Sequence, residues 1–404
     1  MKVAVIGAGI VGLATAWRLV TTGHDVIVID RADEAGQGTS FANGAQLSYS
    51  YVAPLADPSV WKQLPTLMTD PNSPVQFRPG FDLFQYTWLV RFLAACTTRQ
   101  ANETIDRLGE LAALSRSILH GSPELLAASF NLSQSGKLVV YSSEKSFAAA
   151  QHYAERQTRQ GVDKRALSRE ACLSLEPALQ TIGHRLVGGI FAPQDETADT
   201  YLLCRELERL MSEQDGSAQF LYDTTVTGFV REGGRIKAIE TSRGPVQADC
   251  FVLAAGMGSR VLGKMVGIDL PIYPIKGYSL SAPVANRAVA PIVSVTDAAR
   301  KIVIARLGDS LRLAGAADIV GDSLDIDTRR TDKLIADAET DYPGAANWRG
   351  ARLWAGLRPA TPTGQPILGR TRIANLMLNV GHGALGMTLA LGSAQRLADL
   401  VAKG

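Results

Sequence analysis

The first 30 residues alternate between apolar runs and polar or glycine-rich breaks. Residues 2–6 are a short β-branched run, residues 13–20 have helical character, and residues 25–30 are a second apolar run that ends in an acid. A strand, a helix and a second strand in this order are typical of a βαβ unit. Because residues 7–12 read GAGIVG, the pattern predicts a βαβ unit whose first turn is rich in glycine.

Hydrophobic periodicity also predicts the elements that follow. Apolar residues at helical spacing predict helices at residues 101–120, 144–160 and 389–401. Short apolar runs predict strands at residues 188–192, 219–229, 236–241, 251–255, 273–281, 302–306 and 310–314. The last two runs are separated by Leu-Gly-Asp, which is typical of a hairpin. Residues 54–79 hold six of the 18 prolines and precede an aromatic stretch at 81–88, which predicts an irregular excursion.

Composition excludes several classes of protein. The 404 residues include 41 basic and 39 acidic side chains, so the net charge of +2 gives no electrostatic reason to expect a nucleic acid partner. The longest apolar run is much shorter than the roughly 18 residues that a membrane-spanning helix needs, which excludes an integral membrane protein. The opening segment has no cleavage site of the secretory type, so we expect a cytoplasmic protein. The four cysteines are widely spaced, which predicts neither a metal site nor a disulfide framework.

The glycine-rich turn has the spacing of a dinucleotide-binding motif. A G-x-G-x-x-G sequence is weak by itself, but here it follows a strand, opens a helix and precedes an acid at the end of the next strand. Gly7 permits a tight turn, Gly9 lets a pyrophosphate approach the backbone, and Gly12 lets the helix pack on the strand. Asp30 would accept hydrogen bonds from the adenosine ribose. Although Arg31 is compatible with a 2′-phosphate, Asp30 would repel it, which favours FAD or NAD over NADP.

Three further segments favour FAD over NAD. Residues 38–44 form a polar turn soon after Asp30, suited to meeting a pyrophosphate or the flavin pyrimidine. Residues 251–258 form a buried strand ending in glycines, where a cofactor can approach the backbone. Residues 379–388 lead into the C-terminal helix, whose positive dipole end suits the flavin pyrimidine. A plain loop and a plain strand end are the alternatives for the first two segments.

Arg358 is the strongest candidate for binding a substrate. It lies between Gly356 and Pro359, and its planar guanidinium can donate two parallel hydrogen bonds to a carboxylate. The alternative is an ordinary surface arginine. His382, within GHGALGMT, is a second candidate, and its alternative is an ordinary hydrogen-bonded loop histidine.

Six motifs together resemble the D-amino acid oxidase superfamily of flavoproteins, and within it the bacterial D-amino acid dehydrogenases. They are VIGAGIVG at 5–12, SFANGAQ at 40–46, QDETADT at 194–200, PIKGYSL at 274–280, GLRPATPTG at 356–364 and GHGALGMT at 381–388. The resemblance implies a mixed α/β and α+β fold, in which a Rossmann-type FAD-binding domain is interleaved with an antiparallel-sheet substrate domain. We expect the FAD-binding domain at 1–85, 167–256 and 350–404, and the substrate domain at 86–166 and 257–349.

The resemblance also implies roles for individual residues. Arg358 would clamp the substrate α-carboxylate, Tyr278 would be a wall or hydrogen-bond donor of the same pocket, and His382 would complete the catalytic set. The cofactor would contact Gly7, Gly9, Ile10, Gly12, Asp30, Arg31, Ser40, Asn43, Gly44, Val226, Ala255, Gly256, Gly258, Gly381, Gly383, Gly386, Met387 and Thr388. Some relatives attach FAD covalently through a C-terminal cysteine or an N-terminal histidine. Because no cysteine follows Cys250 and only His24 precedes His120, we expect noncovalent FAD.

The expected reaction is oxidative deamination of a D-amino acid to a 2-oxo acid and ammonia, with the Cα hydrogen leaving as hydride. The preference for the D-enantiomer rests on the resemblance alone. The alternatives are an oxygen-using oxidase of glycine, sarcosine or another secondary amine, a proline or hydroxyproline dehydrogenase, and a noncatalytic flavin module. A quinone or another non-oxygen acceptor is expected to take the electrons. Apolar residues of the excursion suit peripheral contact with the inner face of the membrane, or else pack against the substrate domain: Trp61, Leu64, Leu67, Met68, Phe77, Phe81, Phe84 and Trp88.

Overall fold

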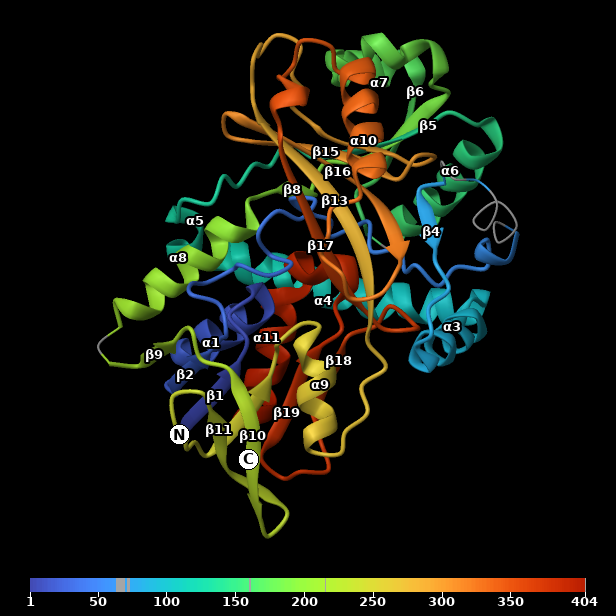
Figure 1. Cartoon of the computed structure of the whole chain (residues 1–404). Coiled ribbons are helices and arrows are strands. Elements are labelled where there is room, and N and C mark those ends of the chain that lie inside the picture. The colour runs from blue at the N-terminus through green and yellow to red at the C-terminus, as the bar shows by residue number, and fades with distance from the viewer. Residues whose placement is uncertain (63–69, 71–72, 160, 215, 404) are drawn as a thin grey trace.

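The computed structural model describes residues 1–62, 70, 73–159, 161–214 and 216–403 (Figure 1). A six-stranded sheet contains the predicted βαβ unit, and its strands run in the order β18-β19-β12-β1-β2-β9. All its neighbouring pairs are parallel except β18 with β19. The unit and the other strands are β1 (Lys2–Ile6), α1 (Ile10–Thr21), β2 (Asp25–Ile29), β9 (Ala218–Leu221), β12 (Cys250–Leu253), β18 (Ile367–Arg370) and β19 (Leu376–Val380).

Both faces of this sheet are covered. Apolar residues of one face pack with helices α1, α4 (Thr98–Gly121), α8 (Thr200–Ser212) and α11 (Gly386–Ala402). The other face packs with the hairpin β10 (Val226–Glu232)/β11 (Arg235–Thr241) and with helix α9 (Gly258–Met265). A parallel sheet that is buried on both faces has strands that are apolar throughout, which is the pattern of β1, β2 and β12.

A nine-stranded sheet forms the second layer, above the first in Figure 1. Its order is β17-β13-β16-β15-β14-β5-β7-β6, and β4 (Val75–Phe77) pairs with β16. The pairs are antiparallel except β14 with β5 and β16 with β4. The strands are β17 (Arg352–Ala360), β13 (Tyr273–Pro283), β16 (Ser310–Ile319), β15 (Ile302–Leu307), β14 (Ser294–Asp297), β5 (Lys137–Tyr141), β7 (Gly188–Ala192) and β6 (Arg165–Ser168).

The remaining elements are short or lie on the periphery. They are β3 (Gln46–Leu47), β8 (Glu196–Thr197), α3 (Leu83–Ala95), α5 (Pro123–Ala127), α6 (Glu144–Arg159), α7 (Arg169–Leu175), α10 (Thr328–Asp341), and the 3₁₀ helices η1 (Pro177–Arg185), η2 (Trp348–Gly350) and η3 (Gly383–Leu385). Among the described residues no helix is both long and apolar enough to cross a membrane. The same residues contain no cluster of side chains suited to holding a metal ion.

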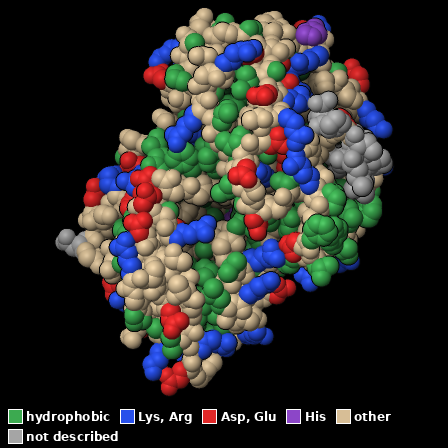
Figure 2. All heavy atoms as spheres, in the orientation of Figure 1, with side chains coloured by type: hydrophobic (Ala, Val, Ile, Leu, Met, Phe, Trp, Pro, Cys, Tyr) green, Lys and Arg blue, Asp and Glu red, His purple; other side chains and the backbone are tan. Residues whose placement is uncertain are grey.

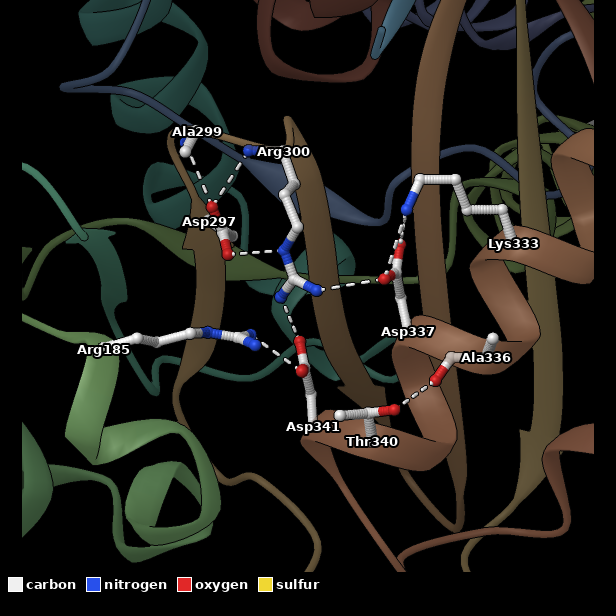
Figure 3. A network of polar contacts seen from close by, with 9 residues as sticks. All are labelled: Arg185, Asp297, Ala299, Arg300, Lys333, Ala336, Asp337, Thr340 and Asp341. Carbon is white, nitrogen blue, oxygen red and sulfur yellow. Dashed lines mark hydrogen bonds and ion pairs between the residues drawn. The ribbon is translucent and has the colours of Figure 1, made fainter. Parts of the chain in front are cut away.

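A network of ion pairs fixes α10 on the outer face of the large sheet (Figure 3). Arg300, in the turn between β14 and β15, pairs with Asp297 at 2.8 Å, with Asp337 of α10 at 3.2 Å and with Asp341 of α10. Arg185 of η1 pairs with the other oxygen of Asp341 at 2.7 Å. One guanidinium thus connects three carboxylates, and the network joins three segments that are far apart in the sequence.

The predicted helices and strands are confirmed with one exception. The predicted irregular excursion is wrong at its aromatic end, where helix α3 begins at Leu83, and residues 63–69 and 71–72 of it lie outside the described residues. The hairpin, the βαβ unit and the three helices form where expected. The predicted strand at 219–229 is wrong as a single element, because the chain ends β9 at Leu221 and begins β10 at Val226. Asp223 between them has a φ of +48°, and a residue in this left-handed conformation cannot continue a strand.

The sheets also place two segments differently from the expected domain ranges. Strands β7 and β17 pair within the large sheet, although residues 167–256 and 350–404 were expected in the FAD-binding domain. β7 lies between β5 and β6, and β17 pairs with the distant strand β13 at the edge of the sheet, and local patterns do not reveal these pairings. The alternation of the chain between two layers is itself as expected.

Candidate active site

The glycine-rich turn between β1 and α1 needs glycines because other backbone atoms lie very close to it. Gly7 has a φ of +117°, and a Cβ there would lie 2.5 Å from the carbonyl oxygen of Ala254. A Cβ on Gly12 would lie 1.8 Å from the carbonyl oxygen of Gly7. At Gly9 the nearest atom would be the Ser40 hydroxyl at 3.4 Å, so the side of this residue away from the protein is open. Gly7 and Gly12 are therefore required by the fold, and Gly9 leaves room for a ligand.

Polar groups predicted to contact a cofactor gather around this turn. Asp30, after the end of β2, accepts hydrogen bonds from the backbone amides of Ala8 at 2.6 Å and Ala32 at 2.9 Å. The buried hydroxyl of Ser40 accepts one from the amide of Ile10, the first residue of α1, at 3.0 Å. The structure thus brings Ile10, Asp30 and Ser40 to the same turn.

Three other residues were predicted to contact the cofactor: Asn43, Gly44 and Arg31. The carboxamide oxygen of Asn43 accepts hydrogen bonds from the amide of Ala45 and the hydroxyl of Thr200, each at 3.0 Å. Gly44 faces β15, because a Cβ there would lie 3.2 Å from Val303. Arg31 is exposed. The site therefore holds Asn43 in a fixed position and leaves Arg31 at the surface.

The residues after β12 and the residues before β10 also lie beside the glycine turn and Asp30. Strand β12 is parallel to β1, so the residues after it lie next to the glycine turn: Ala255, Gly256 and Gly258. Gly256 has a φ of +54° and open space where a Cβ would point. On the far side, the amide of Thr224 donates to the carbonyl oxygen of Asp30 at 2.9 Å. This contact places the start of β10 near Asp30, although the side chain of Val226 itself is buried in the core.

The N-terminus of α11 faces the same region without a side-chain cap. Gly383 has a φ of +56° and open space at its Cβ position, and Gly386 is half-buried. Gly381 serves the fold, because a Cβ there would lie 2.6 Å from a methyl carbon of Thr361. Met387 and Thr388 are buried, and the Thr388 hydroxyl accepts a hydrogen bond from the amide of Ser48 at 3.1 Å. The helix therefore presents unpartnered amides and a positive dipole end at its start.

These features fit an FAD molecule. The start of α1, where the N-cap residue Gly9 has no side chain, suits the pyrophosphate, and the carboxylate of Asp30 suits the ribose hydroxyls. At Gly256 and Gly383 the space where a Cβ would point is open, and at Gly9 the nearest atom to that point is the Ser40 hydroxyl at 3.4 Å. These three glycines form the proposed cradle for the cofactor. The start of α11 suits the flavin pyrimidine, on which negative charge develops upon reduction.

Arg358 lies on β17 and is half-buried. Its guanidinium covers Gly277 of β13, where a Cβ would lie 2.2 Å from Nη2, and Nη1 donates to the carbonyl oxygen of Ala316 at 2.9 Å. Among the described residues no carboxylate forms an ion pair with it. The nearby Asp318 pairs instead with Arg330. Burial lowers the pKa of Arg358 from its usual range, so a carboxylate ligand would supply the missing counter-charge.

Loop contacts connect Arg358 with the cofactor side. The hydroxyl of Thr39 donates to the carbonyl oxygen of Leu357 at 2.7 Å, and the hydroxyl of Ser279 on β13 donates to the carbonyl oxygen of Ala42 at 2.7 Å. The predicted turn at 38–44 therefore lies between the glycine turn and the strand that carries Arg358. A carboxylate bound by Arg358 would therefore lie beside the loop that borders the glycine turn.

The structure does not place Tyr278 in this pocket, which corrects the prediction. Tyr278 pairs with Ala355 across β13 and β17, and Arg358 is three residues beyond Ala355. Since side chains alternate along a strand, Tyr278 and Arg358 lie on opposite faces of the sheet. The Tyr278 ring packs among buried residues that include Leu334 of α10, and burial raises its pKa to about 12. Tyr278 is a core residue of the outer layer.

His382 is likewise directed away from the open region. It is buried, and its Nε2 lies 3.1 Å from the hydroxyl of Ser393 in α11. Burial lowers its pKa to about 4, which keeps the ring neutral near pH 7. The alternative of an ordinary hydrogen-bonded histidine therefore describes His382 better than a catalytic role.

Sequence reasoning missed the segment that follows Gly44. The carboxamide of Gln46 donates to the hydroxyl of Ser294 on β14 at 2.6 Å, and Ser48 accepts a hydrogen bond from the ammonium group of Lys137 at 2.8 Å. A charged residue at the start of the apolar run KLVVY was the one available signal for Lys137.

A βαβ sheet with an open glycine cradle, joined to a mixed sheet that carries an unpaired arginine, defines an FAD-binding oxidoreductase. The family model of FAD-dependent oxidoreductases named DAO matches residues 2–400. The chain belongs to this DAO family.

Relatives match over the whole chain. D-amino acid dehydrogenase 2 of Ralstonia nicotianae is 42% identical over 416 residues, which cover 100% of this chain and 97% of the relative. D-amino acid dehydrogenase of Agrobacterium fabrum is 39% identical over 99% of this chain and 96% of the relative. Among solved structures, glycine oxidase from Bacillus cereus is similar in fold, with a TM-score of 0.77 at 20% identity, covering 100% of this chain and 95% of that chain. L-proline dehydrogenase from P. horikoshii has a TM-score of 0.75 at 18% identity, covering 100% and 93%.

Proposed function

We propose that this protein is an FAD-dependent D-amino acid dehydrogenase that converts D-amino acids to 2-oxo acids and ammonia. The observation that carries the proposal is the half-buried guanidinium of Arg358, which has no ion-pair partner among the described residues and lies beside the loop next to the proposed FAD cradle. Full-length relatives at 35–42% identity carry the name of this activity. The FAD is noncovalent in this proposal.

The residues of the chain supply position and charge. Arg358 would bind the α-carboxylate through two parallel hydrogen bonds and thereby fix the direction of Cα. Bound FAD supplies the redox chemistry by accepting the Cα hydrogen as a hydride. With the substrate amine neutral, loss of the hydride leaves an iminium ion, which water hydrolyses to the 2-oxo acid and ammonia, so no side-chain base at Cα is required. Orientation of this kind can contribute about 7 kcal/mol or more to the rate.

The electrons leave, in this proposal, to a quinone or another acceptor at an apolar surface on α3. Figure 2 shows apolar side chains gathered over this helix. Those exposed there are Phe81, Leu83, Tyr86 and Val90, of which Phe81 is fully exposed. Exposed arginines at 78 and 91 flank them and suit an anionic lipid surface. This surface supports the proposal of peripheral contact with a membrane.

Some of the other apolar residues of the excursion pack in the core, and others are exposed and suit membrane contact. Trp88 is buried and its indole N–H donates to the carbonyl oxygen of Ala360 at 3.0 Å, while Phe77 and Phe84 pack beside it. Trp61 is exposed. Leu64, Leu67 and Met68 lie outside the described residues.

We expect the purified protein to oxidise D-alanine with a water-soluble dye, or with a quinone held in anionic lipid vesicles, as acceptor. The double variant Phe81→Ser/Leu83→Ser should keep the dye activity and lose most of the vesicle-dependent activity, because both side chains are exposed and support no core. Spectrophotometric acceptor reduction and vesicle co-sedimentation measure the two effects. The variant Val289→Ser, at a partly exposed apolar residue elsewhere, is the control.

Hydrogen peroxide formed in proportion to D-alanine consumed, with no dye reduction, would mean an oxygen-using oxidase instead. Equal vesicle activity and co-sedimentation in the α3 variant and the parent would remove the membrane surface while leaving the dehydrogenase assignment intact. Activity restricted to proline or hydroxyproline would replace the substrate assignment.

A further inference from the structure

A tryptophan on β17 lies outside the hydrophobic core of both layers. Trp354 is half-buried, and it belongs to none of the clusters of packed apolar side chains that the described residues form. By contrast, Trp17, Trp88 and Trp348 are buried inside such clusters. A large apolar ring that supports no core is a candidate for contact with a ligand.

The end of the Trp354 ring lies over one of a pair of glycines. Gly356 of β17 is directly opposite Gly277 of β13 in the antiparallel pairing. A Cβ on Gly356 would lie 2.0 Å from Cη2 of Trp354, and a Cβ on Gly277 would lie 2.2 Å from Nη2 of Arg358. Because Cβ positions opposite each other in antiparallel strands are about 4.5–5.5 Å apart, the indole and the guanidinium lie within about 10 Å of each other. The two side chains thus lie side by side in the space that the glycines leave.

Both side chains lie on the face of the sheet that meets the cofactor side. Alternate residues of a strand share a face, so Trp354 and Arg358 point to the same side of β17. Ser279, the partner of Trp354 on β13, donates its hydroxyl to the carbonyl oxygen of Ala42 at 2.7 Å. The indole is therefore next to the turn at 38–44 as well as to Arg358.

The surroundings of Arg358 in the other direction along β17 are already filled. Ile275, which is opposite Arg358 on β13, is buried in a cluster with Trp88 and Ala360. A substrate side chain therefore finds no room there. The half-buried ring of Trp354 is an apolar surface that is still open beside the guanidinium.

We infer that Trp354 forms the wall of the substrate pocket that contacts the side chain of the amino acid, and that it selects apolar side chains over polar ones. The inference rests on the proposed function. With the α-carboxylate on Arg358, the side chain would lie against the indole, and removal of apolar surface from water would stabilise the complex. A polar side chain of the same shape would lose hydrogen bonds to water and gain none from the face of the ring.

A pair of substrates with matched shape tests this wall. D-leucine and D-asparagine have side chains of similar size and branching, and only the second is polar. We expect kcat/KM of the flavin-loaded parent protein to favour D-leucine by about 5- to 150-fold, which is the range for burying an amide without a partner. Steady-state kinetics at one pH measure this ratio, and titration of the substrate amines cancels when variants are compared with the parent.

Replacing Trp354 by alanine should lower kcat/KM for D-leucine by about 3- to 30-fold, and that for D-alanine by less than about fourfold, which is the value of one buried methyl group. The variant should fold, because the ring belongs to no core cluster, and thermal melting checks this. Trp354→Phe keeps a smaller ring and should retain most of the preference for D-leucine. Leu353→Ala, at the next residue of β17 but on the opposite face, is the control and should leave the ratio unchanged.

The glycine pair separates the wall from the carboxylate clamp. Neither glycine has a left-handed φ, so the backbone accepts alanine at both positions. Gly356→Ala would displace the indole and should lower the ratio of D-leucine to D-asparagine. Gly277→Ala would displace the guanidinium of Arg358 instead, and should lower kcat/KM for both substrates by the same factor.

A ratio near one in the parent protein, or equal losses on D-leucine and D-asparagine in Trp354→Ala, would overturn the wall. Weaker FAD binding by the Trp354→Ala apoprotein with an unchanged ratio would also overturn it, because the ring would then contact the cofactor. Each of these results leaves the dehydrogenase assignment intact as long as D-alanine is oxidised. Absence of activity on every D-amino acid, D-alanine included, would overturn the proposed function itself.

Discussion

Replacing Arg358 by methionine should lower kcat/KM for D-alanine by about 30-fold to several thousand-fold, because losing one partner of a buried charge pair costs about 2–5 kcal/mol. Arg358→Lys should lose less but still raise KM and lower kcat together, since one ammonium cannot reproduce two parallel hydrogen bonds. Steady-state kinetics on flavin-loaded protein measure both effects. Arg349→Met, at an exposed arginine paired with the partly exposed Glu339, is the control.

Thermal unfolding separates this role from a structural one. In the free protein Arg358 has no ion-pair partner among the described residues, so the methionine variant should melt at or above the temperature of the parent. Unchanged kinetics in both Arg358 variants would remove the arginine from the site. A large drop in melting temperature would mean that its hydrogen bond to Ala316 serves the fold.

Replacing Gly9 by alanine should weaken FAD binding by about 5- to 150-fold, as expected for about 1–3 kcal/mol of overpacking, and leave the apoprotein folded. The apoprotein should stay folded because Gly9 has an ordinary φ of −77° and the nearest atom to a new Cβ is the Ser40 hydroxyl at 3.4 Å. FAD binding should weaken because the added methyl group takes up space beside the turn that the pyrophosphate would approach. Gly12→Ala should instead destabilise the apoprotein itself, because its Cβ would lie 1.8 Å from the Gly7 carbonyl oxygen.

Titration of the apoproteins with FAD, followed by fluorescence, measures the affinity, and melting without FAD measures the fold. Gly121→Ala, at the exposed end of α4 with open space around it, serves as the matched control. FAD affinity equal to the parent in the Gly9 variant would place the pyrophosphate elsewhere.

Local patterns were enough to predict the βαβ unit and its glycine turn. Gly7, Gly12 and Asp30 lie within one βαβ unit, where spacing along the chain determines position in space. Their geometry confirms the predicted turn, including the close contact between Gly12 and Gly7. The start of α11 also lies where the glycines before it indicate.

The substrate side depends on pairing between distant strands, which the sequence does not reveal. Tyr278 belongs to a recognisable motif, but the side of the sheet that it faces follows from the register of β13 with β17. His382 lies in another such motif, yet its ring contacts Ser393 within the helix layer.

Anaerobic titration of the purified protein with single amino acids tests the central claim most directly. The protein should carry a yellow flavin spectrum that denaturation releases as free FAD. Addition of a D-amino acid should bleach this spectrum and yield the corresponding 2-oxo acid, while its L-enantiomer should leave it unchanged. A protein that binds no flavin, or a flavin that D-amino acids do not reduce, would contradict the assignment.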